Sequence, residues 1–109
     1  MKYTPKHVAK FIDGNIKRYF NPQKLGGRYW ISCNYYSPNN GYNFYFNFRR
    51  PHNWQRSWPL ADCKDCSIEE CIEIIRCLRT DYNWQFTIEY RDFDKDNLWL
   101  VGKELGRLK

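Results

Sequence analysis

The sequence has no acidic residue between Gly14 and Ala61, which is almost half of its 109 residues. Residues 1–60 contain ten Lys or Arg against the single Asp13, a balance of +9. Residues 61–109 contain eight Lys or Arg against eleven acids, a balance of −3. Solubility requires some net charge but no such segregation. The missing acids therefore exclude an acidic mimic of nucleic acid and indicate contact between the first half and a polyanion.

Long apolar runs are also absent. No stretch approaches the roughly 20 residues that a membrane-spanning helix needs, and the first residues, MKYTPKHVAKF, lack the apolar core of a signal peptide. We therefore expect a cytoplasmic protein without a membrane partner, in a compartment where thiols stay reduced. The length predicts a single domain, 1–109, made of a basic unit at 1–60 and an acidic unit at 61–109.

Catalytic signatures are missing as well. The chain has no glycine-rich phosphate loop and no local arrangement of the Ser-His-Asp or Cys-His kind. The run D-x-D-x-D at 92–96 lacks the Gly and the Glu that a calcium loop places at its sixth and twelfth positions. His7 and His52 remain as a candidate acid–base pair of a metal-free ribonuclease. We predict that the protein is not an enzyme and carries no cofactor, with a nuclease as the alternative.

The five cysteines stand at positions 33, 63, 66, 71 and 77, and an odd number argues against a disulfide framework. Cys63 and Cys66 form C-x-x-C, which is half of a zinc site, but no second pair of ligands follows. The segment from Ser67 to Glu70 fits a capping box, which makes Cys66 and Cys71 the two positions of a hydrophobic staple. We therefore predict buried structural thiols and no metal site, with zinc or a redox pair as alternatives.

Two helices are predicted from their start signals and periodicity. Thr4 is a suitable N-cap before Pro5, and apolar residues then recur at helical spacing as far as Phe20. The charged residues of this helix, Asp13 among them, fall mostly outside the apolar stripe. The second helix is predicted to begin at Ser67 and to end near Thr80.

Strand-like alternation follows each helix. Residues 28–36 and 43–49 are predicted to form a hairpin, and residues 84–91 and 98–101 a second one, with a long loop at 50–65 between the two units. In the first hairpin, the side chains of each strand that point towards the core must lie opposite the core-facing side chains of the other strand. This condition places Tyr35 opposite Phe44 and predicts a loop from Pro38 to Gly41, with Gly41 at positive φ. The two inward sets are Ile31, Cys33 and Tyr35, and Phe44, Phe46 and Phe48.

The predicted fold class is α+β: a single antiparallel sheet of about four strands with two helices on one face, in the order α-β-β-α-β-β. The second face of an antiparallel sheet can stay uncovered. On that face the first hairpin would carry only Arg, Trp, Tyr, Asn and Ser side chains, without an acid.

The basic, aromatic-rich half favours a module that binds nucleic acid, most simply single-stranded DNA or RNA. Aromatic rings stack on unpaired bases, and arginines neutralise phosphates. The candidate contact residues are Lys17, Arg18, Arg28, Trp30, Tyr36, Tyr45, Arg49, Arg50, Trp54, Arg56 and Trp58.

A protein-binding module is the alternative, since Trp, Tyr and Arg also dominate protein interfaces. Such a module would be, for example, a phage or mobile-element inhibitor of a host nucleic-acid-handling protein, an anti-CRISPR-like role among them. A second copy of the chain is a further candidate partner, because a homodimer through the open sheet face would bury Trp30 and Tyr45.

Overall fold

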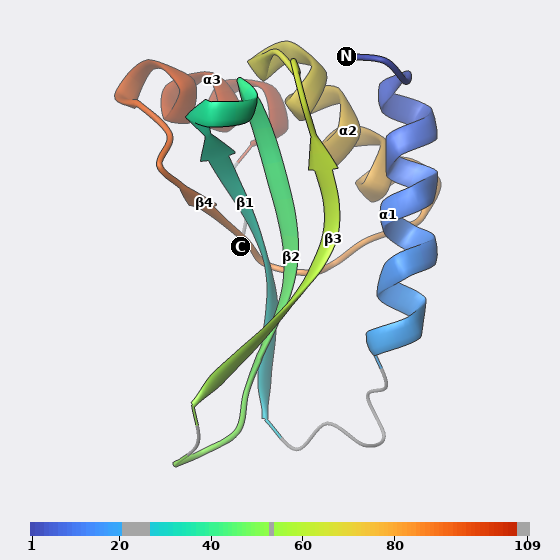
Figure 1. The fold of residues 1–109 in the computed structure, drawn as a ribbon, viewed down its shortest axis with the longest axis vertical. Helices are drawn as coiled ribbons and strands as arrows, with labels where there is room; N and C mark the ends of the chain where they lie inside the picture. Colours follow the sequence, from blue (N-terminus) through green and yellow to red (C-terminus); the bar gives the residue numbers. More distant parts are fainter. Residues whose placement is uncertain (21–26, 53, 107–109) are drawn as a thin grey trace.

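The structure, a computed structural model that describes residues 1–20, 27–52 and 54–106, places three helices beside a four-stranded sheet (Figure 1). In chain order the elements are α1 (Pro5–Tyr19), β1 (Arg28–Tyr36), a 3-10 turn (Ser37–Asn39), β2 (Gly41–Arg49), β3 (Gln55–Cys63), α2 (Ile68–Asp81), β4 (Ile88–Arg91) and α3 (Lys95–Leu105). The α+β class is confirmed.

The first two helices begin where their capping signals predict. The Thr4 side chain accepts a hydrogen bond from the His7 backbone amide, with Pro5 in the first turn. At α2 the capping box is complete, because Ser67 and Glu70 each accept the other's backbone amide at 3.1 Å. No helix in the described residues combines the length and the apolarity that a membrane span requires.

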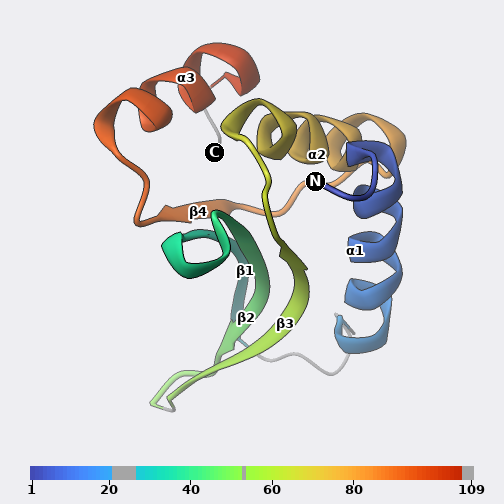
Figure 2. The same cartoon turned by 45° about the horizontal axis from the view of Figure 1, so that its top comes forward.

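The sheet has the strand order β3-β2-β1-β4. The first three strands are antiparallel, and β4 lies parallel to β1. Both α1 and α2 cover the same face, on which Ile31, Phe44 and Phe46 are fully buried against Ile12 and Ile75 (Figure 2). The predicted inward face of the first hairpin is therefore the core.

The register of the first hairpin differs by two residues from the predicted one. Cys33, not Tyr35, lies opposite Phe44, and the pair Tyr36–Gly41 closes a loop of residues 37–40. A shift of two keeps every side chain on its predicted face, whereas a shift of one would have exchanged the faces. The composition of both faces is consequently as predicted, although the individual partners are not.

The glycine after the turn serves a different purpose from the predicted one. Asn40, not Gly41, adopts the left-handed conformation, at φ 47° and ψ 49°. Gly41 is the first residue of β2, and a Cβ built on it would lie 1.8 Å from the carbonyl oxygen of Cys63. Close approach of the β3 backbone therefore requires the glycine.

Two predicted segments were wrong. The expected loop at 50–65 contains β3, an edge strand whose pairing with β2 is irregular near Pro59, where proline is tolerated. The expected second hairpin does not form: only Ile88–Arg91 is a strand, and residues 98–101 lie within α3. Asp94 caps that helix by accepting the Asn97 amide at 2.7 Å, which explains part of the acidic run at 92–96.

The only acid of the first sixty residues is internal. Asp13 is 6% exposed, and its carboxylate accepts the indole N–H of Trp84 at 3.0 Å and pairs with Lys17 at 3.0 Å. Its location contradicts the prediction of an outward charged residue. Burial is tolerated because both carboxylate oxygens have partners. The outer surface of the basic half therefore has no carboxylate among the described residues.

Candidate functional site: the open face of the sheet

The face of the sheet opposite α1 and α2 is called the open face here. The strand register assigns its residues: Arg28, Trp30, Ser32, Asn34 and Tyr36 from β1, Asn43, Tyr45, Asn47 and Arg49 from β2, Gln55, Ser57, Pro59 and Asp62 from β3, and Glu89 and Arg91 from β4. The two central strands carry no acid, as predicted. The outer strands add one acid each, Glu89 and Asp62, and Asp62 accepts a hydrogen bond from Asn39.

The aromatic rings of the open face remain accessible. Trp30 and Tyr45 are half-buried, and Tyr36 is 46% exposed. The guanidinium carbon of Arg28 stands 5.3 Å from the centroid of the Trp30 ring. Trp54, in the connection between β2 and β3, is 81% exposed, the largest exposure among the large apolar side chains of the described residues. Accessible rings of this kind suit stacking on a planar partner.

Three arginines converge at one end of the sheet. Arg28 and Arg49 are direct cross-strand partners, and Arg50 follows at the end of β2. With Pro51 and His52 they line a shallow cavity of about 580 Å³, called the arginine depression below. This end of the sheet points away from α2 and α3, where many of the acids lie (Figure 1). Charge is therefore segregated in space as well as in sequence.

The arginine depression is not neutralised from within. In the part of the chain that the structure describes, the ion pairs join Lys17 to Asp13, and Arg76 to Glu73 and Glu104. None involves an arginine of the depression. A polyanion would supply the countercharge that this surface lacks.

A row of asparagines lies between the rings. Asn34 and Asn43 are opposite each other, and Asn47 accepts hydrogen bonds from Gln55 and Ser57 at 3.2 and 2.6 Å. The Oδ1 atoms of Asn34 and Asn43 and the Nδ2 atom of Asn47 have no partner within the described residues. Buried amide atoms are normally paired. These three atoms are buried, so they are unpaired atoms of the sheet and are not themselves exposed to a ligand on the face.

Six of the eleven predicted contact residues are not on the open face, and two of these, Arg50 and Trp54, lie in the connection between β2 and β3. Trp58 points to the helix side, where its ring stacks on Tyr19 and Phe46 with centroids 5.8 Å away in each case. Arg56 pairs with Phe48 and shares that side. Lys17 and Arg18 belong to the last turn of α1, behind the sheet. Arg91 lies on the open face but was not among the predicted contact residues. The alternation of residues 84–91 shows which side of that strand it occupies, but the sequence does not show that the strand pairs with β1.

The cysteines are buried, as predicted. All five are buried free thiols, and no group of metal-ligating side chains occurs within the described ranges. Cys33 and Cys71 lie in the core with their sulfur atoms 3.5 Å apart. Burial raises the pKa of Cys63 from 9.0 to about 12, with the neighbouring Cys71 and Asp62 adding to the shift. A thiol with so high a pKa is a poor nucleophile near neutral pH.

Because of this shift, Cys63 is expected to make the protein less stable in alkali. Above about pH 9 the unfolded chain loses the thiol proton while the folded chain keeps it, so stability present below pH 9 is lost progressively as the pH rises towards 12. Urea unfolding at about pH 8 and pH 10 should show a lower midpoint at the higher pH. Cys63→Val should show a smaller decrease, and an equal decrease in the variant would contradict the assignment.

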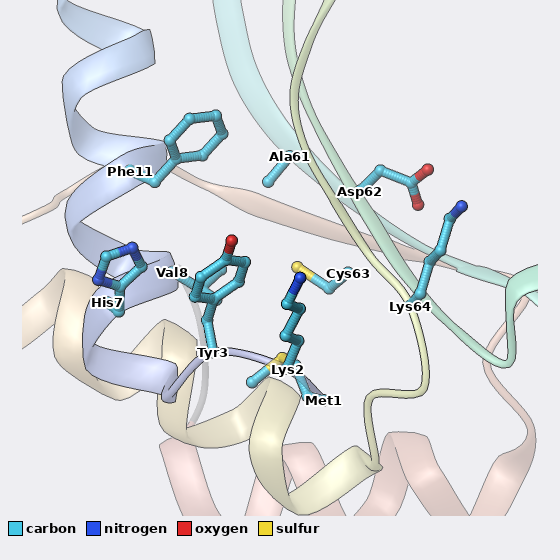
Figure 3. Close-up of a pocket in the computed structure, with 10 residues that line it drawn as sticks. All are labelled: Met1, Lys2, Tyr3, His7, Val8, Phe11, Ala61, Asp62, Cys63 and Lys64. Atoms are coloured by element: carbon cyan, nitrogen blue, oxygen red, sulfur yellow. The ribbon is translucent and has the colours of Figure 1, made fainter.

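A second cavity, of about 550 Å³, lies between the N-terminus, α1 and the end of β3 (Figure 3). His7 and Phe11 of α1 stand across it from Cys63, with Tyr3 stacked on His7 at 5.0 Å. His52 lines the arginine depression instead. The two histidines thus belong to separate cavities and do not form the acid–base pair that a ribonuclease would need.

Searches for similar proteins give no guide to function: no family model, no curated protein and no solved structure matches this chain. The function therefore has to be argued from the open face itself.

Proposed function

We propose that this chain is a nucleic-acid-binding module that holds a single strand of DNA or RNA on its open face. The proposal rests on one observation: the arginine depression, which has no ion pair to neutralise it, adjoins the accessible rings of Trp30 and Tyr45 on the same face of the sheet. Phosphates and bases alternate along a nucleic acid, and the open face presents partners for both.

Each kind of side chain has a separate role. Bases stack on Trp30, Tyr45 and Tyr36, at roughly 1–3 kcal/mol per base, whatever the base is. Arg28 and Arg49 bind phosphates through charge-assisted hydrogen bonds. Asn34 and Asn43, which are partly exposed, offer amide groups to base edges, which single strands expose. Duplexes keep their bases stacked inside, so we expect the same sequence to bind less well when it is paired.

Binding is expected to depend strongly on salt. With three or four phosphates neutralised, counterion release predicts roughly a 20- to 50-fold loss of affinity for a single strand between 50 and 200 mM salt. Fluorescence anisotropy with a labelled oligonucleotide, single-stranded and then paired, measures both preferences. The proposal fails if no oligonucleotide binds at the lower salt concentration.

A protein partner is the second candidate, favoured by the outer side of α3. Leu98 and Trp99 are 44% and 66% exposed, and Lys103 stands 5.2 Å from the Trp99 ring centroid. Large exposed aromatic residues are typical of interface anchors. A pull-down from native extract separates the candidates, since a nucleic-acid-bridged partner is lost after nuclease treatment and a direct protein partner is retained. Light scattering tests the homodimer.

A further inference from the structure

The arginine depression contains an arrangement that disfavours the folded chain. Arg28 and Arg49 lie directly opposite each other at the edge of the β1–β2 ladder, and like charges in that position destabilise a sheet. Arg50 adds a third positive charge to the same cavity. By contrast, Arg76 of α2 pairs with two glutamates, Glu73 and Glu104.

The backbone also brings these charges close together. A Cβ on Gly27 would lie 2.5 Å from the carbonyl oxygen of Arg49, so the start of β1 approaches the end of β2 as only glycine permits. Arg28 follows immediately. The three arginines thus line one cavity, and the guanidinium carbon of Arg50 stands 5.7 Å from the centroid of the Phe48 ring.

The number of the charges indicates which anion they receive. A phosphodiester inside a strand carries one negative charge, whereas a phosphate monoester carries about −1.5 to −2 near pH 7. Three arginines around one cavity match the monoester better. In nucleic acid a monoester occurs only at a phosphorylated end of the strand.

The place of the cavity agrees with an end of a strand. Both β1 and β2 stop at the depression, so a nucleic acid lying along the open face runs out there (Figure 1). Trp30 is the first ring inward from this edge, and its contact with Arg28 places a stacking surface directly beside the cavity. A terminal nucleotide would therefore find both a ring for its base and cations for its phosphate.

We propose that the arginine depression recognises the terminal phosphate of the single strand on the open face. This inference rests on the proposed function and adds that the protein discriminates between strand ends. The depression selects the phosphate monoester; whether it stands at the 5′ or the 3′ end is decided by the experiment.

The test compares oligonucleotides of one sequence, about twelve nucleotides long. One carries a 5′ phosphate, one a 3′ phosphate and one hydroxyl groups at both ends, and all three carry the same fluorophore on the same internal base. At constant salt we expect at least one phosphorylated form to bind about tenfold more tightly than its hydroxyl counterpart, because the monoester gains charge-assisted bonds. In the double variant Arg28→Gln/Arg50→Gln this preference should fall below about twofold.

The control variant is Lys10→Gln, which removes a charge from the exposed side of α1 and should leave the preference unchanged. Equal binding of all three oligonucleotides overturns the inference and leaves the proposed function standing. A preference that survives in the double arginine variant also overturns it, because the phosphate then binds elsewhere. If none of the three binds at low salt, the proposed function and the inference both fail.

Discussion

The double substitution Arg49→Glu/Arg50→Glu is expected to weaken the binding of a single-stranded oligonucleotide about 100-fold or more at low salt. Each change reverses a charge, so the depression that attracts phosphate would then repel it. Both side chains are exposed at the end of β2 and make no ion pair with a described residue, so the fold should be retained. Anisotropy titrations measure the affinity, and circular dichroism checks the fold.

A matched control reverses the same number of charges away from the open face. Lys6→Glu/Lys10→Glu lies on the exposed side of α1 and should reduce affinity only about threefold, through long-range attraction. If both double variants lose affinity equally, binding is a matter of net charge and not of this surface. If the arginine variant keeps oligonucleotide binding and loses a captured protein, the protein-binding alternative is correct.

The second large effect concerns the fold. Gly41→Ala is expected to destabilise the protein by about 3 kcal/mol or more, since the new Cβ would lie 1.8 Å from the Cys63 carbonyl oxygen. Neither group is the end of a flexible side chain, so β2 and β3 must move apart. In thermal unfolding this cost corresponds to a decrease in the midpoint of roughly 10–20 °C.

The substitution Gly14→Ala is expected to have the opposite effect on the stability of the protein. Gly14 lies inside α1, and apart from the backbone of its own helix no atom lies within 4 Å of a Cβ placed at this position. Alanine should therefore stabilise the helix by roughly 0.5–1 kcal/mol. Differential scanning fluorimetry on both variants gives the comparison. A destabilising Gly14→Ala, or a neutral Gly41→Ala, would contradict the packing described for these positions.

Local signals were sufficient for the parts of the fold that local chemistry controls. The Ser67–Glu70 capping box and the Thr4-Pro5 start predicted two helix N-termini correctly. Alternation predicted which side of β1 and β2 faces the core, but it cannot distinguish registers two residues apart, because both satisfy it. The strand pairing of β3 was missed since Pro59 and charged neighbours interrupt its alternation.

One local signal was missed, since Asp94 caps α3 where a strand was predicted. Long-range contacts account for the other differences, such as the parallel pairing of β4 with β1, which joins residues far apart in sequence. Long-range contacts also explain why the predicted contact residues do not all lie on one face. Trp30, Tyr36, Tyr45, Arg28 and Arg49 share the open face, whereas Trp58 is held behind it by Tyr19, a contact that no local pattern indicates.

The internal position of Asp13 has a consequence for control. A protein that keeps a carboxylate on a mobile outer segment can shield its own cations and release them on demand. Here the only carboxylate in the first sixty residues, that of Asp13 in α1, is buried and engaged with Trp84 and Lys17. Since no described carboxylate forms an ion pair with the arginines of the depression, their inhibition would depend on an external anion or on chemical modification of the guanidinium groups.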